Sequence, residues 1–151
     1  GASNTGESYT NKVFDPRHFE LLSLHKSFSL YSLQLGDDAK ALKQHKMDNV
    51  IDLSDKIDSF YTTAKIINDL DLVITSDTSV AHLAGAMGKE VWIVLQKVAD
   101  WRWGVCSSES LWYPSARLFF QHSIGDFNSA FFEIYKALQK KYNVAIKGID
   151  E

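Results

Sequence analysis

The sequence has little cysteine, little proline and no long hydrophobic run. A single cysteine, Cys106, stands among 151 residues, so a framework of internal disulfide bonds is excluded and a reducing compartment is expected. No uninterrupted apolar segment is long enough to cross a bilayer, and no signal peptide begins the sequence. These absences predict a cytoplasmic protein without a membrane span.

A surplus of positive charge is also lacking. The chain carries 16 basic and 19 acidic residues, for a net charge of -3. Because a nucleic-acid or anionic-membrane surface requires a dense basic patch, we expect neither partner. The five histidines are scattered along the sequence, and Asp-Leu-Asp at 69–71 is only a weak candidate for a metal site. We therefore predict no metal and no cofactor.

Hydrophobic residues, in contrast, are abundant and recur with two alternating periods. They make up 45% of the chain, enough for one ordinary domain to bury a core. Segments with helical spacing alternate with short runs typical of strands, which favours a parallel sheet covered on both faces. We predict a single α/β domain of Rossmann-like type over residues 1–151. The expected helices are 15–26, 37–46, 58–70, 78–88 and 127–143, and the expected strands are 27–35, 49–53, 71–76, 90–96 and 116–121.

The segment SDTSVAHLAGAMGK, residues 76–89, combines a polar start with an apolar helix. It follows a predicted buried strand, and α/β sheets bind ligands where such strands end. A helix start has unpaired N–H groups and partial positive charge, yet the residues after Asp77 add no carboxylate. An outside anion such as phosphate fits there, and a neutral His82 can donate to it. The alternative is a plain N-cap at Asp77 or Thr78 with a structural histidine.

The same segment divides into two helical faces. A stripe at i, i+3, i+4 and i+7 is expected to face the sheet, and the polar residues fall together on the other face. Small residues allow close packing, and a glycine at the end suits a left-handed C-cap. The apolar stripe is Val80, Leu83, Ala84 and Met87, the small residues are Ala81, Gly85 and Gly88, and the polar face is Thr78, Ser79 and His82.

Two long runs of this sequence resemble the C-terminal half of glycosyltransferase family nine. They are the D-T-S-x-x-H-L-A-x-A-x-G run at 77–88 and the D-W-R-W…W-Y-P-S run at 100–115. The family contains heptosyltransferases that transfer heptose to lipopolysaccharide, and transferase-like domains attached to bacterial tetratricopeptide-repeat proteins. The resemblance is closer to the second branch. The opening segment, 1–22, resembles the family's G-A-S…K…P…F…L segment more loosely.

The resemblance implies one half of a two-domain GT-B glycosyltransferase. This chain would be the donor-binding half, which grips a nucleotide-diphosphate sugar without a metal, while the N-terminal acceptor domain that supplies the catalytic base is absent. Asp77, Thr78, Ser79, Val80 and His82 would lie at the diphosphate and sugar. The remaining implied residues are Ser3, Asn4 and Lys12 on a facing loop, with Lys12 neutralising phosphate charge, and Gln34 and Gly36 at the edge of the nucleotide or sugar pocket.

The sequence also departs from the family's pattern. Gly88-Lys89-Glu90 stands where G-x-P is usual, an acid is lost at 60–64, and a glutamate is replaced at 37–40. The first strand of a doubly wound sheet, expected before Gly1, is absent as well. Because that strand is central, its loss would leave two open edges, so we expect a strand from another chain, pairing in a homo-oligomer, or an altered strand order.

An aromatic loop at 99–115 is open to two interpretations. Its tryptophans can stack on a base or sugar while Arg102 pairs with phosphate, or the loop simply packs onto its own or a partner domain. The loop residues considered for these roles are Trp101, Arg102, Trp103, Trp112 and Tyr113.

At the level of function, a non-catalytic interaction domain that kept the fold is the alternative to a donor-binding domain. A dinucleotide-dependent oxidoreductase is disfavoured, because no G-x-G-x-x-G follows a strand.

Overall fold

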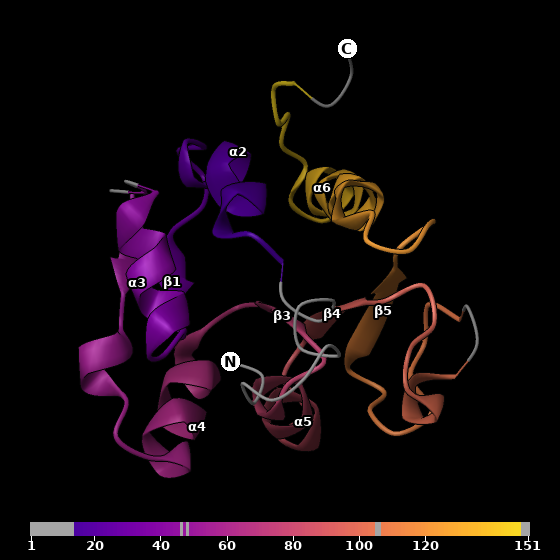
Figure 1. Ribbon diagram of the computed structural model, residues 1–151, viewed down its shortest axis with the longest axis horizontal. Helices are drawn as coiled ribbons and strands as arrows, with labels where there is room; N and C mark the ends of the chain where they lie inside the picture. Colours follow the sequence, from indigo (N-terminus) through magenta and orange to yellow (C-terminus); the bar gives the residue numbers. More distant parts are fainter. Residues whose placement is uncertain (1–13, 46, 48, 105–106, 149–151) are drawn as a thin grey trace.

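The computed structural model describes residues 14–45, 47, 49–104 and 107–148. Its strands alternate with helices, and every strand pair is parallel, which confirms an α/β fold in a Rossmann-like arrangement (Figure 1). The helices and 3-10 turns are η1 (Pro16–Phe19), α2 (Glu20–Ser23), α3 (Asp37–Gln44), η2 (Ser54–Lys56), α4 (Phe60–Asp69), α5 (Ser79–Ala86), η3 (Trp101–Trp103) and α6 (Phe127–Tyr142), and the strands are β1 (Leu30–Ser32), β2 (Val50–Asp52), β3 (Val73–Ser76), β4 (Val91–Leu95) and β5 (Ala116–Phe120).

Local capping explains where several helices begin. Asp15 accepts a hydrogen bond from the backbone N–H of Arg17, and Pro16 occupies the first helical position, as the sequence predicts. Ser59 caps α4 and Asp126 caps α6 in the same way. The first helical segment ends at Ser23 rather than at residue 26. Beyond Ser23 the N–H of His25 donates to the carbonyl of Leu22 and that of Phe28 to the carbonyl of His25, which are bonds of turns. The ring of His25 also lies 3.0 Å from the carbonyl of Ala145, and this contact holds the turn in place.

The central strand β4 organises the core. All five of its residues are buried, and their side chains alternate between the two faces of the sheet. Trp92 and Val94 pack with α6 and α2, whereas Val91, Ile93 and Leu95 pack with α5 and α4. Figure 1 shows α2 and α6 on one side of this sheet and α4 and α5 on the other. The hydrophobic layers therefore follow from a strand that is apolar at every position.

The strands form two separate sheets. β1 pairs with β2, and β3, β4 and β5 form a second sheet in that order. The predicted strand at 27–35 shortens to the three residues of β1, because only Leu30, Tyr31 and Ser32 pair with β2. Within the described ranges, β1 and β3 each have one strand partner, so each leaves one edge open. No helix among these residues has the length and apolarity of a membrane span.

Candidate functional site

Helix α5 begins without a side-chain cap. Thr78 is its N-cap residue, but its hydroxyl lies 3.1 Å from that of Thr75 on β3 and makes no capping bond. The carbonyl of Thr78 accepts from the N–H of Ala81 at 3.0 Å and of His82 at 3.4 Å. The interpretation of Thr78 as a plain side-chain cap is therefore wrong, because its hydroxyl is used to tie the helix start to the strand before it.

Two backbone N–H groups stand at the start of this helix. In the part of the chain that the structure describes, the backbone N–H groups of Ser79 and Val80 have no acceptor, and the first turn contains no acidic residue. The helix dipole adds partial positive charge at the same place. Backbone donors in a positive field at a strand's carboxyl end are the features that bind phosphate oxygens. This part of the site can therefore hold an anion.

His82 lies one turn into the helix and is held on three sides. Its Nδ1 is 2.9 Å from the hydroxyl of Tyr113, and its ring stacks on Trp103 with centroids 5.1 Å apart and planes at 26°. Its Nε2 lies 3.8 Å from the carboxylate of Asp77. When the Tyr113 hydroxyl donates to Nδ1, the proton of the neutral ring is on Nε2, on the side of Asp77. The contacts thus fix the orientation of the ring. In this tautomer the Nε2–H is the group that can donate a hydrogen bond.

The aromatic loop supplies two of these contacts and exposes two other rings. Trp103 is 1% exposed and lies in the core with Tyr113 against it, which fits the packing interpretation for these two residues. Trp101 is 76% exposed and meets Trp112 edge-on with centroids 6.4 Å apart. Arg102 is already engaged, since its Nε lies 3.0 Å from Asp100. A phosphate role for Arg102 would therefore require exchange of that partner.

Tyr113 also determines how α5 packs. A Cβ added at Gly85 would lie 2.5 Å from the ring of Tyr113, so only glycine fits there. The buried face of the helix is accordingly formed by Ala81, Ala84 and Gly85. The prediction that Met87 faces the sheet is wrong, because Met87 is 39% exposed and is the C-cap residue. The predicted small residues allow the close approach, as expected.

The C-terminal end of α5 has the expected left-handed cap. Gly88 has φ of +69°, its N–H donates to the carbonyl of Gly85, and the N–H of Lys89 donates to that of Ala84. Lys89 also closes the end of α4, because its Nζ donates to the carbonyls of Asn68 at 3.0 Å and Leu70 at 2.7 Å. These hydrogen bonds hold the C-terminal end of α5 in place, and the rest of the helix with it.

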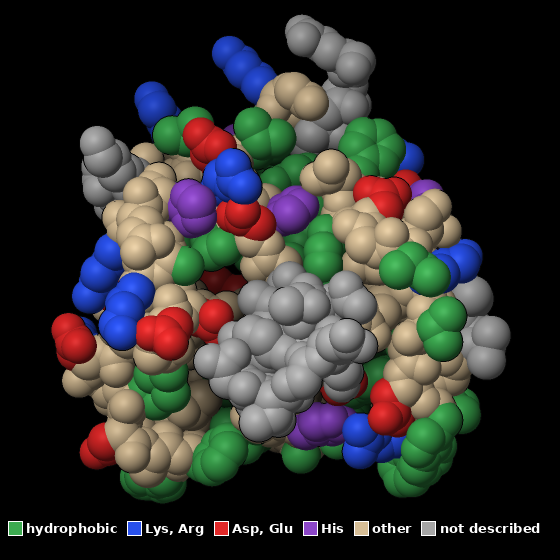
Figure 2. Space-filling view, viewed as in Figure 1, with side chains coloured by type: hydrophobic (Ala, Val, Ile, Leu, Met, Phe, Trp, Pro, Cys, Tyr) green, Lys and Arg blue, Asp and Glu red, His purple; other side chains and the backbone are tan. Residues whose placement is uncertain are grey.

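Gln34 and Thr78 both line a groove between the two sheets. This groove has a volume of about 190 Å³ and is lined by residues of β1 and β3, with Gln34, Thr78 and Val80 among them. Figure 2 shows the hollow between these strands. Gly36 follows at the start of α3 with φ of +62°. The predicted residues Ser3, Asn4 and Lys12 lie outside the described residues, as does Cys106.

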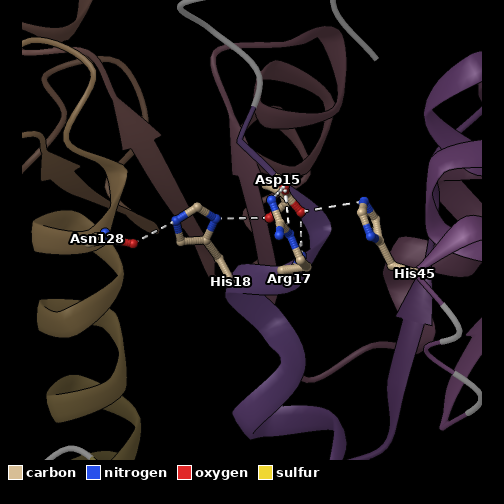
Figure 3. Close-up of polar contacts among 5 residues, drawn as sticks. All are labelled: Asp15, Arg17, His18, His45 and Asn128. Carbon is tan, nitrogen blue, oxygen red and sulfur yellow. Dashed lines mark hydrogen bonds and ion pairs between the residues drawn. The ribbon is translucent and has the colours of Figure 1, made fainter.

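A second polar cluster joins the first turn of the structure to its neighbours (Figure 3). Asp15 pairs with Arg17 at 2.6 Å and lies 3.8 Å from the ring of His45 after α3. The side-chain hydrogen bond from Arg17 lowers the pKa of Asp15 to about 2. His18 stacks on Phe131 of α6 and contacts Asn128 at 3.1 Å. These contacts bind η1 to α3 and α6, so the cluster is structural.

The histidine contacts were not predictable from local sequence. Trp103 and Tyr113 were considered as loop residues, but nothing in their spacing predicts that both would touch His82.

Among the described residues, no group of three or more His, Cys, Asp or Glu side chains is placed to hold a metal ion. Comparison with protein-family models, curated proteins and solved structures finds no match. The resemblance to glycosyltransferase family nine therefore stays a prediction, and the geometry must support any function.

Proposed function

We propose that this chain is the nucleotide-diphosphate-sugar-binding domain of a GT-B glycosyltransferase, which transfers a sugar to a glycan or protein acceptor. The observation that carries the proposal is the start of α5, where the N–H groups of Ser79 and Val80 have no acceptor among the described residues. His82, one turn into the same helix, is held in a fixed orientation by Tyr113 and Trp103. The resemblance in the sequence gives the anion its identity as the diphosphate of a sugar donor.

In this proposal the chain stabilises the leaving group. Charge develops on the nucleoside diphosphate as the sugar departs, and preorganised N–H donors stabilise that charge without reorganising. The N–H groups of Ser79 and Val80 contact phosphate oxygens, and His82 donates from Nε2. Gln34 and Gly36 border the nucleotide or sugar. The base that activates the acceptor is expected from an acceptor domain, and the role of residues 1–151 is to bind the donor.

Substitution at Ser79 tests this role with a matched pair of variants. Ser79 is the first residue of α5, a position that accepts proline, and the extended Thr78 (φ -138°, ψ 171°) is compatible with a following proline. Ser79→Pro therefore removes the N–H and the hydroxyl, whereas Ser79→Ala removes the hydroxyl alone. By calorimetry with ADP, GDP and UDP sugars, we expect Ser79→Pro to bind about ten-fold more weakly than Ser79→Ala. Absence of nucleotide binding by the unaltered protein at millimolar concentration would contradict the proposal.

A non-catalytic interaction domain is the second candidate function. It is favoured by four large apolar side chains that the aromatic loop and its flank leave exposed, and exposed apolar groups of this kind often mark contacts with other proteins. Under this alternative the protein binds a partner through the loop and no nucleotide at α5. The exposed residues are Val98, Trp101, Leu111 and Trp112.

A further inference from the structure

The aromatic loop before β5 displays two tryptophans at the surface on an anchored backbone. Trp101 is 76% exposed and Trp112 is 59% exposed. The Oγ of Ser110 accepts a hydrogen bond from the backbone N–H of Trp112 at 3.2 Å. Asp100 caps η3 by accepting from the backbone N–H of Arg102 at 3.1 Å. The backbone on which both rings stand is therefore held in place, while much of each side chain remains in water.

The two indole rings form a corner. Trp101 and Trp112 have centroids 6.4 Å apart, and their planes meet at 74°. One ring can thus stack on the flat face of a ligand while the other borders its edge, and both are contacts that aromatic rings favour. Because the rings are already positioned, a ligand does not have to order them on binding. A corner of this size fits a ligand one ring wide with an apolar face.

The residues on either side of Trp101 form an ion pair. Nε and Nη2 of Arg102 lie 3.0 and 3.1 Å from the two carboxylate oxygens of Asp100, and both side chains are partly exposed. A guanidinium group has five N–H donors and this pair uses two of them, while each carboxylate oxygen accepts more than one hydrogen bond. The opposite charges cancel. The pair therefore offers donors and acceptors to a neutral ligand and does not favour an anion.

We propose that Trp101, Trp112, Asp100 and Arg102 form a binding site for a neutral sugar ring of a glycan. A pyranose ring has a face of C–H groups, which packs on an indole, and a rim of hydroxyl groups, which donate and accept hydrogen bonds. The corner supplies the apolar contact, and the ion pair supplies partners for adjacent hydroxyls. None of these four residues belongs to the anion site at α5, so the inference does not rest on the proposed function.

A protein partner is the other ligand to which exposed tryptophans point. An extended peptide that binds through its backbone needs an open strand edge. The edge of β5 beside this loop is already used, because Glu109 forms an antiparallel bridge with Arg117 and the N–H of Leu118 donates to the carbonyl of Ser108 at 2.9 Å. The rings and the ion pair are then the features that recognise a ligand here, and together they match a sugar.

Titration of the unaltered protein with neutral oligosaccharides tests the proposal. The probes are maltohexaose, cellohexaose and chitohexaose, followed by tryptophan fluorescence and calorimetry. The control is sorbitol, which carries hydroxyl groups but no ring. We expect saturable binding of at least one oligosaccharide and none of sorbitol. Absence of binding by all three at about 10 mM would overturn the proposal.

The same protein titrated with nucleotide sugars keeps this result apart from the proposed function. Oligosaccharide binding without nucleotide binding would reject the proposed function and support the glycan site. Nucleotide binding without oligosaccharide binding would reject the glycan site alone.

Variants of the loop identify the residues that bind. Trp101→Ala removes a ring of the corner, whereas Leu111→Ser removes an apolar side chain of the same loop that is 95% exposed. We expect Trp101→Ala to weaken oligosaccharide binding at least about ten-fold and Leu111→Ser to leave it unchanged. Arg102→Met keeps the length of the side chain without its donors and should weaken binding several-fold. Circular dichroism checks that each variant folds.

Two outcomes would make the loop a protein interface instead. One is an equal loss of oligosaccharide binding in Trp101→Ala and Leu111→Ser, which would show that apolar area alone matters. The other is a dimer in light scattering that Leu111→Ser abolishes. Either outcome would overturn the proposed sugar site.

Discussion

The imidazole Nδ1 of His82 lies 2.9 Å from the hydroxyl of Tyr113, 31 residues further along the chain. This contact joins the start of α5 to the loop before β5 and fixes the ring that stacks on Trp103. A histidine held in this way presents one nitrogen to its surroundings in a defined orientation. Tyr113 is thus a positioning residue for the candidate anion site.

Tyr113→Phe isolates the role of this hydroxyl. The ring remains against Trp103 and Gly85, so folding should lose only about 1 kcal/mol of unfolding free energy. Because His82 loses the group that selects its tautomer, we expect nucleotide-sugar affinity to fall several-fold in calorimetry. The matched control is Tyr61→Phe on the exposed side of α4, which should change neither quantity. Unchanged affinity in Tyr113→Phe would remove Tyr113 from the site.

Gly85→Ala tests the close packing under Tyr113. In an isolated helix this substitution is favourable by up to about 1 kcal/mol. Here the added Cβ would meet the Tyr113 ring at 2.5 Å, so we expect a net loss of about 1–3 kcal/mol in urea unfolding. In the double variant with Tyr113→Ala the clash is absent, and the loss caused by Gly85→Ala should disappear. Additive losses would contradict the packing argument.

The helices and strands could be predicted from the sequence because buried apolar residues recur with the period of a helix or a strand. The expected strands at 90–96 and 116–121 appear as β4 and β5, and the expected helix at 127–143 appears as α6. Caps such as Asp15 fixed a helix start because their hydrogen bonds are local. These features depend on neighbours within a few residues or on general rules of sheet topology.

The failures have a common physical origin in contacts between distant residues. The helical stripe assigned Met87 to the buried face because it is apolar and lies seven residues after Val80. The actual face is set by Tyr113, which lies over Gly85 and favours the smallest side chains. The surroundings of His82 depend on the same loop, whose path no local spacing predicts. The sequence therefore indicates the start of α5 as a candidate site, while the contacts of its residues could not be predicted.

Asp15 makes stability depend on acidic pH. The hydrogen bond from Arg17 lowers the pKa of Asp15 to about 2 from an ordinary value of 3.8, so the folded state favours the charged carboxylate. A depressed pKa contributes stability that is fully present above pH 3.8 and is lost as pH falls through about 2. In urea unfolding from pH 7 to pH 2, Asp15→Asn should therefore be less stable at neutral pH and approach the unaltered protein in acid.

A matched substitution separates this effect from general acid unfolding. Asp37 pairs with Lys40 on the exposed face of α3, and both side chains are largely in water. Asp37→Asn should leave unfolding free energy nearly unchanged at every pH, because exposed ion pairs contribute little. If Asp15→Asn differs from the unaltered protein by the same amount at pH 2 and pH 7, the bond to Arg17 is not the source of the pH dependence.

Glu90, directly before β4, contacts both a buried residue of that strand and a residue of α6. Its Oε1 accepts from the indole N–H of buried Trp92 at 3.1 Å, and its Oε2 lies 2.8 Å from Lys141 on α6. Glu90→Ala leaves the indole donor without this acceptor, so we expect a loss of about 1–3 kcal/mol in unfolding free energy. Glu90→Gln keeps an acceptor and gives up only an exposed ion pair, which costs at most about 1 kcal/mol. Equal losses in the two variants would show that the ion pair, rather than the indole bond, ties β4 to α6.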